Sequence, residues 1–150
     1  MLNFTRRHRG QYLRELAAEP LFHDVPKHLM PVIGRAVDVL QLATGRTLPC
    51  DPAREVVILI EGQALLEDSL HRPIAMIGPG RSIGGRDRRD TDGRCITAVS
   101  KVRCVVITRR ELWPLLDMAP GVARAIDAAI DEPARRPAVA ERPFLPSDVG

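Results

Sequence analysis

The sequence is poor in aromatic residues, which make up 3% of its 150 residues. Aromatic side chains are the stacking platforms of many proteins that bind single-stranded nucleic acid, so few such platforms are available here. Neither sign of charge dominates, because 22 basic residues oppose 19 acidic ones and leave a formal net charge of +3. A dedicated nucleic-acid-binding protein carries a strong basic patch. The composition therefore argues against that class of protein.

Long hydrophobic runs are also absent. No stretch approaches the roughly 18 apolar residues of a membrane span, and the N-terminus lacks the apolar core of a secretion signal. We therefore expect a soluble cytoplasmic protein with no membrane partner. The length and a hydrophobic fraction of 45% suit one domain with a single core and a tail.

Cysteine is scarce and irregularly placed. Cys50, Cys95 and Cys104 form an odd set without close spacing, which predicts neither a disulfide framework nor a zinc motif. No His-x-His pair lies on an expected strand, which argues against a metal-binding cupin, a fold with similar strand content. We therefore predict no metal site. Because the sequence also contains no recognisable nucleophile–base pair, we predict no catalytic residues and no enzyme activity.

What the sequence does contain is a series of short apolar runs separated by turn residues. These runs predict strands over residues 39–42, 56–60, 63–66, 74–77, 96–99 and 102–107. Apolar residues at helical spacing predict helices over residues 11–19, 26–37, 109–118 and 121–130. The run over residues 56–60 is apolar on both faces, so we expect a strand covered on both sides, as in a closed sheet. These patterns alone indicate a fold that is mainly β or α+β.

The domain organisation follows from shifts in composition. We expect an N-terminal arm and helix over residues 1–19, in which residues 1–10 form a frayed basic arm. A folded domain is predicted over residues 20–130, and a Pro-rich disordered tail over residues 131–150. Within the domain, residues 49–52 are expected to form a turn. Thr108 and Glu111 have the spacing of a capping box at the start of a helix.

Residues 77–99 carry the candidate binding site. They contain a Gly-Pro-Gly turn, the pair Gly84 and Gly85, a charged loop, and Arg94 at the start of an expected strand. Glycine has no Cβ, so its backbone amide can approach a ligand closely. Amides in such a concavity bind anions, and a guanidinium group matches phosphate oxygens. The stretch is therefore a candidate anion pocket, and the alternative is an ordinary glycine turn followed by an exposed arginine.

The same stretch resembles the phosphate-binding cassette of the cyclic-nucleotide-binding domain family, found in cAMP receptor proteins and in regulatory subunits of cAMP-dependent kinase. That cassette reads roughly Leu-Gly-Pro-Gly-Asp-Phe-Phe-Gly-Glu, then eight residues, then Arg-Ser/Ala-Ala-Thr. Here residues 77–85 read Ile-Gly-Pro-Gly-Arg-Ser-Ile-Gly-Gly, and after eight residues, 94–97 read Arg-Cys-Ile-Thr. The resemblance extends over roughly residues 20–130. It implies a β-roll or jelly-roll barrel of about eight strands with short flanking helices.

The resemblance also implies roles for particular residues. Arg94 would pair with a cyclic phosphate beside the Gly84 and Gly85 backbone, and Cys95 stands where a Ser or Thr can hydrogen-bond the ligand. Gly85 replaces the glutamate that accepts a hydrogen bond from the ribose. Losing that bond costs about 1.5–3 kcal/mol, or roughly ten- to a hundredfold in affinity. We therefore expect binding of cAMP or cGMP, the ligands that the resemblance implies, to be weak or lost.

The leading hypothesis is thus a non-enzymatic regulatory domain with a degenerate phosphate-binding cassette and no resident cofactor. In family terms, ligand capture by Arg94 would move the helix over residues 109–118. The alternative is a protein–protein interaction module on the same scaffold, with no nucleotide ligand. DNA binding is not expected, because family members that bind DNA carry a helix-turn-helix after the barrel and this sequence contains none.

Overall fold

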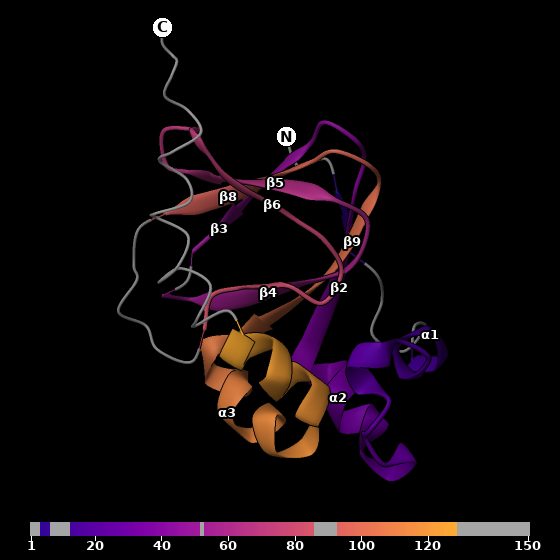
Figure 1. Cartoon of the computed structure of the whole chain (residues 1–150). Coiled ribbons are helices and arrows are strands. Elements are labelled where there is room, and N and C mark those ends of the chain that lie inside the picture. Colours follow the sequence, from indigo (N-terminus) through magenta and orange to yellow (C-terminus); the bar gives the residue numbers. More distant parts are fainter. Residues whose placement is uncertain (1–3, 7–12, 52, 86–92, 129–150) are drawn as a thin grey trace, which may run out of the picture.

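Two antiparallel sheets form most of the structure (Figure 1). The computed structural model describes residues 4–6, 13–51, 53–85 and 93–128. The five-stranded sheet has the order β1 (Phe4–Arg6), β2 (Val37–Leu42), β9 (Val102–Thr108), β4 (Glu55–Glu61) and β7 (Ser82–Ile83). The four-stranded sheet has the order β3 (Thr47–Cys50), β8 (Arg94–Ala98), β5 (Ala64–Asp68) and β6 (Pro73–Ile77). The prediction of a mainly β fold with about eight strands is confirmed, with nine strands among the described residues.

The core of the β-structure lies between these two sheets. Its buried side chains come from both of them, among them Leu42, Leu59, Leu66 and Ile96. Burying one such side chain stabilises the fold by about 1.5–3 kcal/mol. This apolar layer fixes the relative position of the sheets and so of the loops at their ends.

The helices cover the outer face of the five-stranded sheet (Figure 1). They are α1 (Leu13–Ala17), α2 (Met30–Ala36), α3 (Arg109–Met118) and a further helix over residues 120–128, with two 3-10 turns at Pro20–Phe22 and Lys27–Leu29. Their buried side chains form a second apolar cluster with the outward-facing residues of β4 and β9. Among the described helices, none is long and apolar enough to cross a membrane.

Strand β4 shows why its sequence is apolar on both faces. Val57 and Leu59 belong to the layer between the sheets, whereas Val56 and Ile58 pack with the helices. The expectation of a strand covered on both sides is therefore confirmed: the other sheet covers one face of β4, and the helices cover the other.

All six predicted strand runs fall on observed strands, but three strands were missed. Residues 49–52 were expected to form a turn, whereas Pro49 and Cys50 belong to β3. Proline is tolerated there because β3 is an edge strand and needs no donor on its free side. Strand β7 has two residues, too few to make a pattern. The prediction of a frayed arm is wrong for Phe4–Arg6, which form β1 and pair with β2.

The helix predictions hold with corrections at the ends. Helix α3 has the predicted bounds, but its predicted capping box is wrong. The Thr108 hydroxyl donates to Glu111 Oε1 at 3.3 Å, and no side-chain bond to the helix backbone forms. The domain boundaries stay predictions. The predicted tail over residues 131–150 lies outside the described residues.

Candidate functional site

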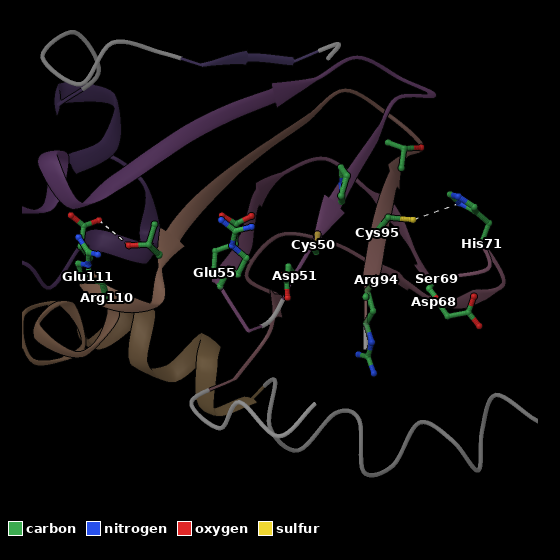
Figure 2. A pocket seen from close by; sticks show the side chains of 15 residues that line it. Cys50, Asp51, Glu55, Asp68, Ser69, His71, Arg94, Cys95, Arg110 and Glu111 are labelled. Carbon is green, nitrogen blue, oxygen red and sulfur yellow. Dashed lines mark hydrogen bonds between the residues drawn. The ribbon is translucent and has the colours of Figure 1, made fainter. Parts of the chain in front are cut away.

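A cavity of about 1180 Å³ lies at one end of the sheets (Figure 2). Its wall runs from the turn between β5 and β6, past the ends of β3 and β8, to the start of β4 and the start of α3. The polar backbone ends of several strands therefore meet here, at the place where the apolar layer between the sheets stops. A ligand in this cavity would touch both sheets and the first turn of α3.

Arg94 and Cys95 both line this cavity. Arg94 is the first residue of β8, in register with Cys50 on β3 and Asp68 on β5. Its half-buried side chain extends beyond the end of the strand, beside Asp68 and Ser69 (Figure 2). The position expected for Arg94, at the start of a strand in the mouth of a β-structure, is therefore the observed one.

The cavity wall carries charges of both signs. Among the described residues, it contains four carboxylates (Asp51, Glu55, Asp68 and Glu111) and three arginines (Arg54, Arg94 and Arg110). Backbone N–H groups and the guanidinium of Arg72 hold the pKa of Asp68 below its ordinary value, so this carboxylate is ionised at neutral pH. Carboxylates therefore outnumber arginines among the described lining residues. The described part of the wall does not form a positive cradle.

Gly84 and Gly85 are not among the described lining residues of this cavity. Gly84 follows β7 with a φ of +102°, a conformation that favours glycine. The carbonyl of Gly85 accepts a hydrogen bond from the guanidinium of Arg109, the first residue of α3. The structure thus brings Arg94 and Cys95 together at the cavity and places the glycine pair against Arg109. Residues 86–92, which join the two parts of the cassette, lie outside the described residues.

Arg109 is a site residue that the sequence analysis missed. Its side chain is only 8% exposed, and its backbone N–H donates to the carbonyl of Arg54 at 3.0 Å. It therefore ties the first turn of α3 both to the cassette and to the segment before β4. A signal was present in the sequence, because Arg109 shares the buried helical stripe of Leu112 and Leu116.

Cys95 also has neighbours that sequence spacing did not reveal. Its thiol lies 3.5 Å from Glu67 Oε1 and 3.6 Å from His71 Nδ1. Burial, with help from Glu67, raises the pKa of Cys95 to about 11, so the thiol is protonated at neutral pH and donates to the carboxylate. A hydrogen bond from Thr97 lowers the pKa of Glu67. Among the described residues, this trio is the group that could hold a metal ion.

No protein-family model matches the sequence, and no curated protein matches it. Solved structures do match. One is "Sp-2Cl-cAMPS bound to PKAR CBD2", with a TM-score of 0.58, 12% identity, and coverage of 88% of this chain and 90% of that chain. Another is a putative cyclic nucleotide-binding protein from Geobacter metallireducens, with a TM-score of 0.56, 17% identity, and coverage of 78% and 93%.

The chain has the fold of a cyclic-nucleotide-binding domain. The same cyclic-nucleotide-binding fold occurs in the regulatory subunit of a cAMP-independent protein kinase A from Trypanosoma cruzi bound to guanosine. That match has a TM-score of 0.57 and 16% identity, and it covers 89% of this chain and 51% of that one. The chain thus spans about half the length of this subunit, and 46% of its Trypanosoma brucei counterpart. The resemblance read from the cassette is confirmed at the level of the fold.

Proposed function

We propose that the chain is a non-enzymatic regulatory module on the cyclic-nucleotide-binding fold, in which binding of cAMP or cGMP is weak or lost. The observation that carries this proposal is the composition of the cavity wall. Arg94 stands where a phosphate-pairing arginine is expected, yet among the described lining residues four carboxylates share the wall with three arginines. A cyclic phosphate carries a negative charge, so these carboxylates oppose its entry.

Position 85 adds to this penalty. A glycine there offers no acceptor to a ribose hydroxyl, and its carbonyl is already bonded to Arg109. The missing hydrogen bond to a carboxylate costs about 1.5–3 kcal/mol, or roughly ten- to a hundredfold in affinity. Together with the charge of the wall, this supports a scaffold that has kept the cavity and lost much of its capacity to read a cyclic nucleotide.

The same contacts supply a route from the cavity to the rest of the fold. Arg109 joins Gly85 to the first turn of α3, and Arg110 and Glu111 of that turn line the cavity. A ligand that displaces the cassette or these side chains changes the contacts of α3. Regulation in this module would therefore be read out as a movement of α3.

Calorimetry with cAMP, cGMP and guanosine tests the proposal. We expect a Kd weaker than about 100 µM for both cyclic nucleotides, or less than about 5.5 kcal/mol of binding free energy. Guanosine is included because the Trypanosoma cruzi neighbour is named as bound to it, and because an uncharged nucleoside avoids the repulsion of the wall. Gly85→Glu should raise cAMP affinity about ten- to a hundredfold, whereas the neutral Gly85→Gln should raise it much less.

Arg94→Ala should abolish whatever binding the Gly85→Glu variant gains, and the exposed Arg35→Ala on α2 serves as the matched control. Micromolar binding of cAMP by the unmodified chain would contradict the loss of affinity. Binding that survives Arg94→Ala would mean that the pocket is placed wrongly.

The second candidate is a protein–protein interaction module without a nucleotide ligand. It is favoured by Trp113 on α3, whose side chain is 55% exposed. Tryptophan is enriched at protein interfaces. This candidate predicts no thermal shift with any cyclic nucleotide, together with a partner that the unmodified chain retains and the Trp113→Ala variant loses.

A further inference from the structure

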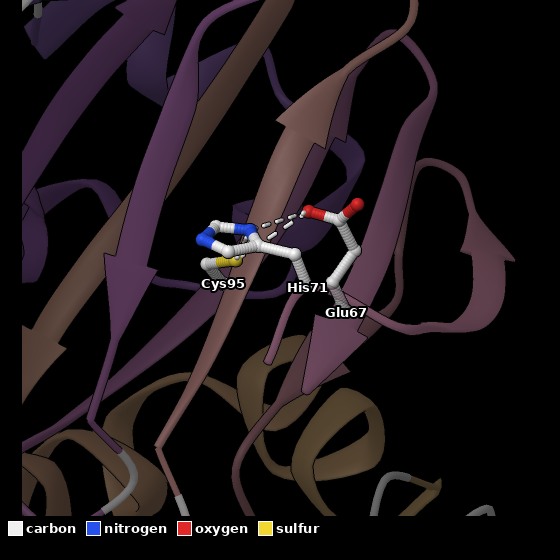
Figure 3. Close-up of side chains that lie close together, drawn as sticks. All are labelled: Glu67, His71 and Cys95. Atoms are coloured by element: carbon white, nitrogen blue, oxygen red, sulfur yellow. Dashed lines mark hydrogen bonds and ion pairs between the residues drawn. The ribbon is translucent and has the colours of Figure 1, made fainter. Parts of the chain in front are cut away.

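Three different metal-ligating atoms converge beside the cavity (Figure 3). They belong to Glu67 on β5, His71 in the turn before β6, and Cys95 on β8. The sulfur of Cys95 lies 3.5 Å from Glu67 Oε1 and 3.6 Å from His71 Nδ1. His71 Nδ1 lies 3.5 Å from the same carboxylate oxygen. The three atoms form a nearly equilateral triangle.

This triangle has the size of one face of a tetrahedral zinc site. Zinc binds sulfur at about 2.3 Å and histidine nitrogen or carboxylate oxygen at about 2.0–2.2 Å, which at tetrahedral angles sets the ligand atoms about 3.4–3.6 Å apart. We propose that Glu67, His71 and Cys95 bind a zinc ion, with its fourth coordination position open. On binding, the sulfur–zinc bond replaces the sulfur–hydrogen bond of Cys95, and the proton leaves to solvent.

The geometry argues against a catalytic relay in the same three residues. In a nucleophile–histidine–carboxylate triad, the two ring nitrogens of histidine face different partners. Here Nδ1 of His71 faces both the sulfur and the carboxylate. The ring of His71 therefore does not lie between the thiol and the carboxylate, as the histidine of a triad lies between its two partners. Convergence of three donors on one point is what a metal ion requires.

The ligating groups are held in place by their neighbours. Glu67 Oε1 accepts a hydrogen bond of 2.9 Å from Thr97 Oγ1, which lies 2.9 Å from Thr47 Oγ1 on the neighbouring strand. Groups that orient a ligand in this way raise metal affinity about ten- to a hundredfold. The site therefore needs little rearrangement to accept the ion.

The turn that carries His71 is fixed as well. The carboxylate of Asp68 accepts hydrogen bonds of 2.9 Å from the N–H groups of Leu70 and Arg72. His71 itself has a φ of +63°, a conformation uncommon outside glycine, and its N–H donates to the carbonyl of Asp68 at 2.9 Å. The turn thus brings the ring over Cys95 on the neighbouring β8.

The donor set selects the kind of ion. Thiolate, imidazole and carboxylate together suit zinc, whereas magnesium and calcium prefer oxygen ligands alone. Because His71 and Cys95 also line the cavity, a zinc ion between them would lie at its wall. The proposal does not rest on nucleotide binding, and its test uses metal ions alone.

The experiment titrates metal-free protein with zinc by calorimetry and with cobalt by absorption. We expect one ion per chain, and a cobalt complex with sulfur-to-metal charge-transfer absorption, which requires a thiolate. His71→Gln and Cys95→Ala should each weaken zinc binding at least about tenfold. The side chain of His71 is 68% exposed, so His71→Gln is expected to fold and can carry the test alone.

Matched controls come from residues of the same types outside the trio. His28→Gln, at an exposed position, and Cys50→Ala, at a buried one, should bind zinc as the unmodified chain does. Failure of the unmodified chain to take up zinc would overturn the proposal. So would charge-transfer absorption that persists in Cys95→Ala, or zinc affinity that is unchanged in His71→Gln.

Discussion

Gly121 is a position at which an added methyl group would meet the backbone of a neighbouring turn. It is the second residue of the helix over residues 120–128 and packs against the backbone of the turn at Pro20–Phe22. A Cβ at Gly121 would lie 3.0 Å from the carbonyl carbon and 3.3 Å from the Cα of Leu21, and closer still to the carbonyl oxygen. Ordinary contacts between carbon atoms lie at about 3.5–4.0 Å. The obstacle is backbone, so no side-chain rotation relieves it.

Two opposing effects decide the outcome of Gly121→Ala. Alanine favours a helix over glycine by up to about 1 kcal/mol. Overpacking a closed site costs about 1–3 kcal/mol, and here the helix must also shift the buried Val122 and Ile126 against the sheet. We expect the packing cost to exceed the helix gain, for a net loss of about 1–2 kcal/mol in the free energy of unfolding.

Urea unfolding of Gly121→Ala measures this loss directly. The midpoint should fall while the slope with denaturant stays the same, since the surface exposed on unfolding is unchanged. Gly93→Ala is the control, because nothing lies within 4 Å of an added Cβ there, and its stability should change by less than about 0.5 kcal/mol. An alanine variant at 121 that is as stable as the unmodified chain would refute the packing argument.

Two further predictions concern the partly buried Arg103 and the buried Cys104. Arg103 joins Glu19, which is 12% exposed, to Glu61, which is 59% exposed. Arg103→Met should cost about 1–3 kcal/mol of stability because Glu19 loses its cation, and Glu61→Gln less than about 1 kcal/mol, both read by urea unfolding. Burial raises the pKa of Cys104 from 9.0 to about 12, so the stability that this thiol contributes is complete below pH 9.0 and is lost as the pH rises through about 12. Cys104→Ala should flatten this alkaline loss, and a loss equally steep in the variant would contradict the assignment.

The sequence allowed the β-structure to be predicted where strands are long and apolar. Apolar, β-branched runs such as residues 102–107 predict a strand that is covered on both faces, and the structure has a strand there. Strand β3 was missed because proline, here Pro49, is by residue type a signal for a turn. A strand can contain proline when it lies at the edge of a sheet, as β3 does. That information lies in the tertiary structure.

The candidate site divides in the same way. Arg94 could be placed at the start of a strand because the signal is local, in the spacing of glycines and an arginine along one segment. The contact between Glu67 and Cys95 could not be predicted, because it depends on the register between β5 and β8, in which these two residues are paired. A pattern read along the chain does not report the register between strands whose paired residues, here Glu67 and Cys95, are 28 positions apart. His71 joins them only through its unusual turn conformation.

Cys95 links the two proposals and sets a condition on both. As a thiol it has one proton to donate, and that proton is already directed at Glu67. As a zinc ligand it has none, and the wall of the cavity gains the two positive charges of the ion for the one proton released. Arg94 is the residue next to Cys95, so anion binding at Arg94 would be favoured in the zinc-loaded state. In the zinc-free state the carboxylates of the wall would oppose it. If zinc binds as proposed, the affinity of this cavity for a phosphate depends on the metal state, and nucleotide titrations are comparable between variants only when zinc occupancy is the same in each.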